Sequence, residues 1–221
     1  MFLKTDGAGN LSFSSDLPTT SFTGATAETS IAGGDLVLIY DDSATAVRKM
    51  TRTNFVAGIG ASAGQVIQVV QTVKTDTFST TSTSFVDVTG LSVSITPSSA
   101  SNKILVLVQI SYGGAVNMYG SAKLIRGSTS IFEGNSDSAS RTESTIPMTT
   151  TNEANSEASK MYNGSIFYLD SPSTTSSTTY KIQIRTSSAS ENITVNRTSA
   201  DADASYTNRS TSSITVMEVK G

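Results

Sequence analysis

The alternation of apolar and polar residues is clearest from Phe78 to Tyr112, where it predicts β-strands. Apolar residues alternate with serine and threonine over 91–96, the period-two pattern of a strand with one buried face. A shorter strand is expected at 84–88, and Gly90 is expected to end it. The nearly continuous apolar run from Ile104 to Ile110 is typical of a central strand that is buried on both faces.

The remainder of the chain after residue 75 repeats this pattern of short strands and Ser/Thr-rich turns. Further strands are predicted at 117–126, 130–133, 165–169, 179–185, 192–195 and 213–219. About eight strands at spacings of roughly 8–15 residues suit a two-sheet sandwich. No segment predicts a helix. We therefore expect an all-β protein with a C-terminal antiparallel β-sandwich, jelly-roll-like or TNF-like.

The N-terminal part predicts an arm followed by a β-hairpin. Residues 1–34 are rich in Gly, Ser and Thr, and their isolated apolar side chains cannot bury enough surface to fold alone. We expect this arm to lie on another copy or another protein; the alternative is that it packs on the chain's own C-terminal domain. Strands are expected at Leu36–Tyr40 and Val47–Thr51, with the turn beginning at Asp41-Asp42-Ser43.

Two short segments connect the hairpin to the sandwich. Residues 55–64 are small and flexible in composition, as in a linker. Residues 65–73 fit either a helical or a strand pattern, and their β-branched content favours a strand. This strand either lines a three-fold axis between copies or is buried in its own domain. The expected organisation is an anchoring arm with hairpin at 1–60, a linker or trimer-contact strand at 61–75, and a β-sandwich head at 76–221.

Composition agrees with this fold and excludes several classes of function. Only 15% of the 221 residues are charged, against about 25% in average domains. Serine and threonine, roughly a third of the chain, supply the missing polarity and suit exposed strand faces. The net charge of −3 argues against nucleic-acid binding, which needs a basic surface.

The missing residue types are equally informative about chemistry. The chain has no Cys and no His, so it cannot form disulfides, thiolate zinc sites, His-based metal sites or a Ser-His-Asp triad. No apolar run approaches the ~18 residues that span a bilayer, and no signal peptide is visible. We predict no enzymatic activity, no cofactor, no bound metal and no membrane insertion.

Three groups of carboxylates are candidate sites. Asp35, Asp41 and Asp42 could form a cation site, but aspartate also favours turns through local hydrogen bonds, which we prefer. Asp201 and Asp203 could hold Ca²⁺, but a solvated loop is the preferred interpretation. A glycosidase pair could in principle come from these residues: Glu133, Glu143, Glu153, Glu157 and Asp170.

Several features argue against a glycosidase. There is no Trp to stack against a sugar, and most of these acids fall in the polar stretch 134–160. The tyrosines are expected in strand cores or on sheet surfaces: Tyr112, Tyr119, Tyr162, Tyr168, Tyr180 and Tyr206. Any recognition is expected from the loops at 134–160 and 171–178, since long loops are commonly functional. No individual receptor-binding residue is assigned.

Several segments carry a resemblance to a known group of proteins. The run TSFVDVTGLSVSITPSSASNKILV at 83–106 resembles tail-fibre-like and other virion proteins of tailed bacteriophages, especially aquatic ones. LIRGSTSIFEG, FYLDSPSTTSSTTYKIQIR and SSITVMEV are similar to later parts of the same module. FLKTDGAGNLSF and GDLVLIYDDSATAVRKMTRTNF resemble stem and connector pieces of such fibres. Together these segments cover most of the chain.

The resemblance implies a virion structural protein, usually a homotrimer with a jelly-roll-like C-terminal head. We expect a surface fibre or knob whose head contributes to host attachment, through a surface glycan or an outer-membrane protein. The N-terminal arm would contact other virion proteins of the tail or capsid. The alternative is a trimeric capsid decoration (cement) protein whose arm lies on capsid subunits; a glycan depolymerase is a distant third. The expected location is the virion, with synthesis in the bacterial cytoplasm.

Overall fold

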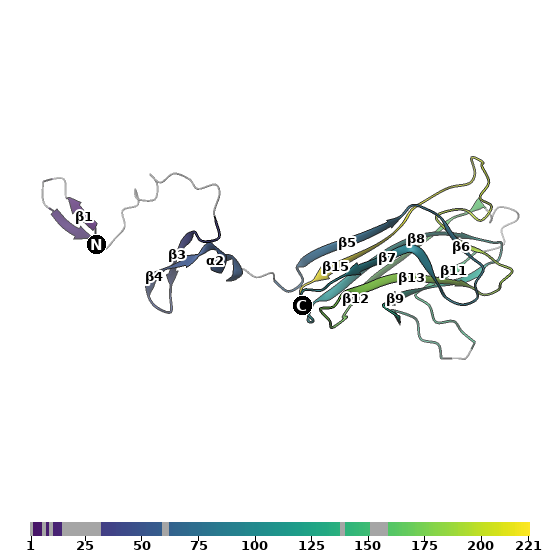
Figure 1. The fold of residues 1–221 in the computed structure, drawn as a ribbon, viewed down its shortest axis with the longest axis horizontal. Helices are drawn as coiled ribbons and strands as arrows, with labels where there is room; N and C mark the ends of the chain where they lie inside the picture. Colours follow the sequence, from purple (N-terminus) through teal and green to yellow (C-terminus); the bar gives the residue numbers. More distant parts are fainter. Residues whose placement is uncertain are drawn as a thin grey trace. The chain divides into compact units, whose positions relative to one another are not determined.

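The chain forms two compact units, Met1–Gly60 and Ala61–Gly221. The structure is a computed structural model that describes residues 2–5, 8, 11–14, 32–58, 62–137, 140–150 and 159–221. Figure 1 shows the strands of both units. The arm residues 15–31 and part of the polar stretch 134–160 lie outside the described residues.

The first unit contains two hairpins and a short helix. Strands β1 (Phe2–Thr5) and β2 (Leu11–Ser14) pair antiparallel within the segment 1–34, for which the sequence predicts an extended arm. Strands β3 (Leu36–Asp41) and β4 (Ala46–Thr51) pair antiparallel, which confirms the predicted hairpin. The helix α2 (Arg52–Gly58) follows β4 directly.

The expectation of no helix is wrong at α2. The hydroxyl of Thr51 accepts the Asn54 N–H at 3.2 Å, as a helix N-cap does. The Arg52 N–H donates to the Asp35 carbonyl at 2.7 Å, and the Thr53 hydroxyl donates to the Gly33 carbonyl at 2.8 Å. These tertiary bonds fix the first turn, and seven residues are too few for a helical pattern to appear in the sequence.

The second unit is a sandwich of two antiparallel sheets (Figure 1). The first, here called the β5 sheet, has the order β5 (Val66–Lys74), β15 (Ser212–Val219), β8 (Lys103–Gly114) and β12 (Tyr162–Asp170). The short strands β14 (Ile193–Val195) and β6 (Phe78–Thr80) pair beyond β15, along the end of β8. The second, here called the β7 sheet, has the order β7 (Val86–Ile95), β13 (Thr178–Thr186) and β9 (Tyr119–Arg126), with β10 (Thr129–Ile131) and β11 (Ile146–Thr149) both on β9.

The pairing of early with late strands is that of a jelly roll. The pairs β5–β15, β7–β13, β8–β12 and β9–β11 are nested in the sequence, and successive pairs fall alternately in the two sheets. The predicted all-β, jelly-roll-like sandwich is therefore confirmed. The strand β5 belongs to this sandwich through its full pairing with β15, whereas the sequence placed 61–75 in a separate connecting segment.

The core lies between the two sheets. One row of register partners in the β5 sheet is Val70, Val216, Val106 and Tyr168, and Val106 and Val216 are fully buried. The β7 sheet packs against this row with its own buried side chains: Val88, Leu91, Val93, Ile95, Leu124, Ile182 and Ile184. Each such side chain contributes about 1.5–3 kcal/mol on burial, so this layer holds the two sheets together.

Gly90 bends a strand instead of ending one, which corrects the prediction. The strand β7 runs without interruption from Val86 to Ile95, and Gly90 has a φ of +81°. The register against β13 shifts between Lys181, opposite Ser92, and Gln183, opposite Asp87. Glycine adopts a positive φ without strain, so it suits a bulge as well as a turn.

Candidate interaction surfaces

The outward side of the β5 sheet carries a band of apolar side chains across four strands. Val69, Met217, Leu105 and Leu169 are register partners, and Leu107 and Phe167 belong to the next row. Partners in an antiparallel ladder point to the same side of the sheet. Phe167 is 72% exposed, Val69 55% and Leu169 47%. We call the surface of Val69, Val73, Leu105, Leu107, Phe167, Leu169 and Met217 the apolar face.

No charged residue lies within the apolar face. Its remaining outward positions are Gln71, Gln109, Ser165, Ser213 and Thr215. The Gln71 side-chain amide donates to the Thr215 hydroxyl at 2.8 Å, so these two polar groups satisfy each other. Lys103, at the start of β8, lies at the end of the band. Exposed apolar surface of this kind makes the face a candidate interaction surface.

Strand β8 shows how this face departs from the sequence expectation. Ile104, Val106, Val108 and Ile110 point inward and are at most 3% exposed, as predicted. The prediction that β8 is buried on both faces is wrong for the single chain, because Leu105 and Leu107 point outward and are only half-buried. The continuous apolar run Ile104–Ile110 therefore contains both inward core residues and outward residues of the apolar face, although its pattern predicts core on both sides.

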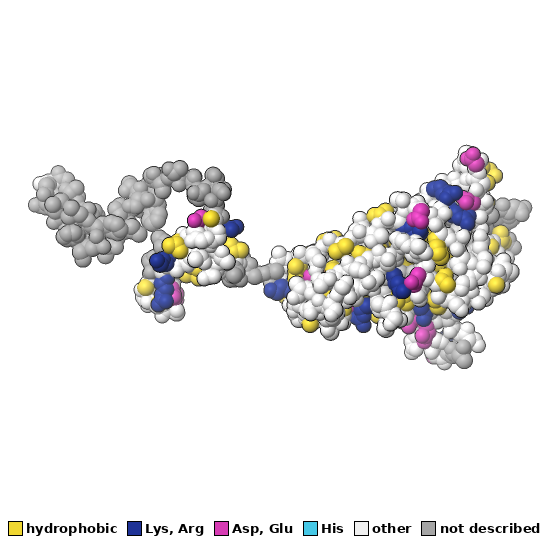
Figure 2. Space-filling view, in the orientation of Figure 1, with side chains coloured by type: hydrophobic (Ala, Val, Ile, Leu, Met, Phe, Trp, Pro, Cys, Tyr) yellow, Lys and Arg dark blue, Asp and Glu magenta, His cyan; other side chains and the backbone are white. Residues whose placement is uncertain are grey.

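The outward side of the β7 sheet differs in character. Lys181 on β13 forms an ion pair with Asp87 on β7 at 2.7 Å, and the Gln183 amide donates to the same carboxylate at 2.7 Å. The hydrogen bond from Lys181 holds the pKa of Asp87 below its ordinary value. Arg185 and Lys123 occupy outward positions on β13 and β9. We call this surface the charged face; Figure 2 shows basic and acidic side chains side by side on the sandwich.

Asp170, a candidate catalytic acid, is part of a buried structural network. Asp170 is 3% exposed, and its carboxylate accepts bonds from Arg126 at 2.8 and 2.9 Å and from the Tyr180 hydroxyl at 2.6 Å. Burial, reinforced by Asp170, raises the pKa of the Tyr180 hydroxyl. The network joins the end of β12 to β9 and β13, so it connects the two sheets.

The other predicted glycosidase acids are held by separate partners. Glu133 forms an ion pair with Lys123 at 2.7 Å and accepts the Ser130 hydroxyl, and the Lys123 bond lowers its pKa. Glu143 accepts the Ser136 N–H at 3.2 Å. Glu153 and Glu157 lie outside the described residues. The described acids therefore serve as structural acceptors with their own donors.

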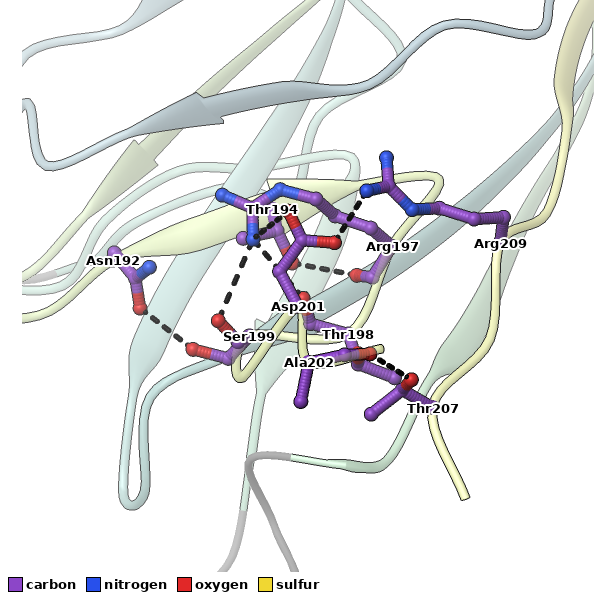
Figure 3. A network of polar contacts seen from close by, with 9 residues as sticks. All are labelled: Asn192, Thr194, Arg197, Thr198, Ser199, Asp201, Ala202, Thr207 and Arg209. Carbon is purple, nitrogen blue, oxygen red and sulfur yellow. Dashed lines mark hydrogen bonds and ion pairs between the residues drawn. The ribbon is translucent and has the colours of Figure 1, made fainter. Parts of the chain in front are cut away.

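The aspartate Asp201 forms ion pairs with two arginines in the segment after β14 (Figure 3). Asp201 accepts Arg209 at 2.6 Å and Arg197 at 3.5 Å, so two cations neutralise its carboxylate. Asp201 and Asp203 line a pocket of ≈ 400 Å³ that also contains Thr207 and Arg209. Within the described part of the chain, no group of three or more metal-ligating acids comes together.

The same local use of carboxylates occurs in the β3–β4 hairpin. Asp41 accepts the Ser43 hydroxyl at 2.6 Å and the Ala44 N–H at 3.1 Å, and the Ser43 bond lowers its pKa. Asp35 accepts the Ala32 N–H at 2.7 Å. Both side chains thus bond within their own turns, as the preferred interpretation of this cluster expects.

The tyrosines divide between core and surface. Tyr180 and Tyr112 are buried, and Tyr112 stacks on Tyr162 with ring centroids 5.6 Å apart. Tyr168 packs against the core and stacks on Phe132 at 4.6 Å. Tyr119 and Tyr206 are exposed. Among the described residues, no helix is long and apolar enough to cross a membrane.

Comparison with known proteins finds structural likeness only, without a match to a protein family or a curated protein. A chain from a structure of infectious bursal disease virus, Gx strain, is similar with 13% identity and a TM-score of 0.35. The match covers 84% of this chain and 42% of that chain, so this chain spans less than half of that chain's length. At this identity and TM-score the likeness does not extend to function.

Proposed function

We propose that the chain is a non-enzymatic structural protein of a bacteriophage virion, a homotrimeric fibre or knob whose jelly-roll head contributes to host attachment. The single observation that carries the assembly part is the apolar face, where Val69 on β5 and Phe167 and Leu169 on β12 are exposed at the two edges of one outward band. The virion part rests on the resemblance of the sequence segments to phage virion proteins.

A second copy of the chain is the occupant that best suits the apolar face. Specific contacts with an unlike partner commonly use complementary charges, and this face has none to offer. Two copies of an uncharged face can contact each other without electrostatic repulsion. Aliphatic and aromatic side chains are also typical of interfaces between copies. The outward leucines of β8 would then complete the burial on both faces that the run Ile104–Ile110 predicts.

The alternative, a trimeric capsid decoration protein, uses the same face and differs only in location. The separate N-terminal unit, with its two hairpins and α2, supports a role as an anchor on other virion proteins in either case. Copy number separates the two: hundreds per particle indicate capsid decoration, and far fewer indicate a fibre.

The test is the mass of the purified full chain in solution, together with its location in particles. We expect a mass of three chains by light scattering and a position on the particle surface by electron microscopy. A monomer at micromolar concentration would contradict the assembly, and absence from particles would contradict the virion role.

A further inference from the structure

Arg185, on the charged face, lacks the carboxylate partner that its neighbours have. Lys181 pairs with Asp87 and Lys123 pairs with Glu133, each at 2.7 Å. Arg185 donates from its Nε to the Thr186 carbonyl at 3.2 Å, and within the described residues it forms no ion pair. Its two terminal nitrogens therefore remain available to a ligand.

The guanidinium of Arg185 is held in place beside an aromatic ring. Its Cζ lies 5.8 Å from the ring centroid of Phe85, and the Nζ of Lys123 lies 5.0 Å from the same centroid. Phe85 and Arg185 are both half-buried. A planar guanidinium next to an aromatic ring loses little freedom when it binds a carboxylate with both nitrogens.

These side chains line a pocket of ≈ 470 Å³ on the charged face, together with Arg141, Thr142 and Glu143. Arg141 is neutralised by Asp137 at 2.6 Å, which leaves Arg185 as the cation of the described lining without an ion-pair partner. The Glu143 carboxylate in the same pocket accepts the Ser136 N–H at 3.2 Å. Thr142 offers a hydroxyl, and Glu143 offers an acceptor to ligand hydroxyls. The two terminal nitrogens of Arg185 can bind one carboxylate, and the Thr142 hydroxyl and the Glu143 carboxylate can bind hydroxyl groups. This combination fits a ligand with one carboxylate and several hydroxyls.

We propose that this pocket binds an acidic sugar of the uronic-acid class, with the carboxylate on Arg185 and ring hydroxyls on Thr142 and Glu143. The inference rests on the proposed function and names the chemical class of the surface glycan. The pocket belongs to the β7 sheet, so it stays open when the apolar face of the β5 sheet is covered. Weak binding at one site becomes firm attachment when three copies engage one polysaccharide.

The experiment is a ligand-observed NMR titration of the full chain with methyl β-D-glucuronide, methyl β-D-glucoside and acetate. We expect saturable binding of the glucuronide with a dissociation constant of about 1 mM, and at least about tenfold weaker binding of the other two. Arg185→Gln should lose the glucuronide signal, and Arg185→Lys should retain part of it because the charge remains without the fork. Lys181→Gln is the matched control, since it removes one cation from the same strand outside the pocket.

Three results would overturn the inference. These are no binding of the glucuronide, equal binding by Arg185→Gln, and equal binding of acetate, which would indicate an adventitious anion only. A trimer on the particle surface without glucuronide binding would refute this inference and leave the proposed function standing. A monomeric chain absent from particles would refute the proposed function, whereas glucuronide binding would be unaffected.

Discussion

The two outer faces of the jelly roll are both outward sides of antiparallel sheets, but one carries paired charged side chains and the other carries exposed apolar ones. On the charged face, Lys181, Asp87 and Gln183 bond across strands and satisfy one another. On the apolar face, the side chains of Phe167 and Val69 are exposed, and being apolar they can form no such bonds. The difference is one of chemistry: the outward polar groups of one side are paired across strands, and the outward side chains of the other are largely apolar and exposed.

The energies of the two faces differ in the same direction. Exposed ion pairs contribute at most about 1 kcal/mol each, so the charged face adds little to stability and mainly keeps the head soluble. Burying one large apolar side chain contributes about 1.5–3 kcal/mol. Several such side chains on the apolar face can therefore drive association between copies.

The largest effect is expected from Val106→Asp, compared with the adjacent Leu107→Asp. Val106 is fully buried between the sheets, and an unpaired carboxylate there costs several kcal/mol, on the order of the whole stability of a domain. Soluble expression and circular dichroism should show loss of the fold. Leu107 points outward, so Leu107→Asp should keep the fold and lose the trimer. A soluble, trimeric Val106→Asp protein would show that the assignment of the two faces of β8 is wrong.

The next largest effect is expected from Phe167→Lys. Phe167 lies on β12, at one edge of the apolar face, and a charge buried in the interface there should weaken association by roughly 2–4 kcal/mol, whereas the thermal stability of the monomer should change little. Sedimentation velocity across a range of concentrations measures the association. Ser94→Lys, at an exposed position of β7 on the other sheet, is the control and should leave the trimer intact.

A smaller, pH-dependent effect is expected from Glu218, which ties β15 to β5 and to the loop between β7 and β8. Burial raises its pKa, but the bonds from Asn102, Gln68 and Ser98 outweigh burial and lower it to about 2, from an ordinary 4.5. The folded state therefore favours the ionised form. This stabilisation is complete above pH 4.5 and is lost as the pH falls towards 2.

The measurement for Glu218 is urea unfolding of the wild type and Glu218→Gln between pH 2 and 7. The wild type should be more stable at neutral pH, on the order of 2 kcal/mol for lost bonds to a charged group. The difference should shrink below pH 4.5. A constant difference at all pH values would show that the carboxylate is not held in its ionised form.

The smallest effect is expected from Lys181→Met on the charged face. Removing one exposed ion pair should lower the free energy of unfolding by less than about 1 kcal/mol and leave association unchanged. The pKa of Asp87, followed by NMR, should rise because the Lys181 bond that lowers it is gone. A loss of several kcal/mol would contradict the small contribution to stability assigned to the ion pairs of the charged face.

The sequence predicted the inner half of this molecule better than the outer half. Period-two alternation located the strand at 91–96 and the buried residues of β8, because burial between two sheets imposes that pattern. It misjudged Gly90, since glycine serves equally for turns and for bulges. It missed α2, whose first turn depends on tertiary bonds to Asp35 and Gly33.

The two candidate surfaces are harder to predict from the sequence because their residues come from several strands. Leu105 and Leu107 look like core in one dimension, and only the register with Phe167 and Leu169 shows that they form one outward band. Arg185 and Phe85 are 100 residues apart in the chain, and the β7–β13 pairing brings them to one pocket. The apolar run of β8 is a local signal for only part of the apolar face, and the residues of the Arg185 pocket form no local pattern at all.

The central claim is that copies of the chain bury the apolar face and leave the charged face open. Because the chain has no cysteine, Phe167→Cys and Ser94→Cys each introduce a single thiol, and both positions are exposed in one isolated chain. The decisive measurement is the rate of maleimide labelling of each variant in its assembled form, with the mass of the assembly checked in parallel. We expect slow labelling at position 167 and fast labelling at position 94. Equal, fast labelling at both positions in a trimer would contradict the account.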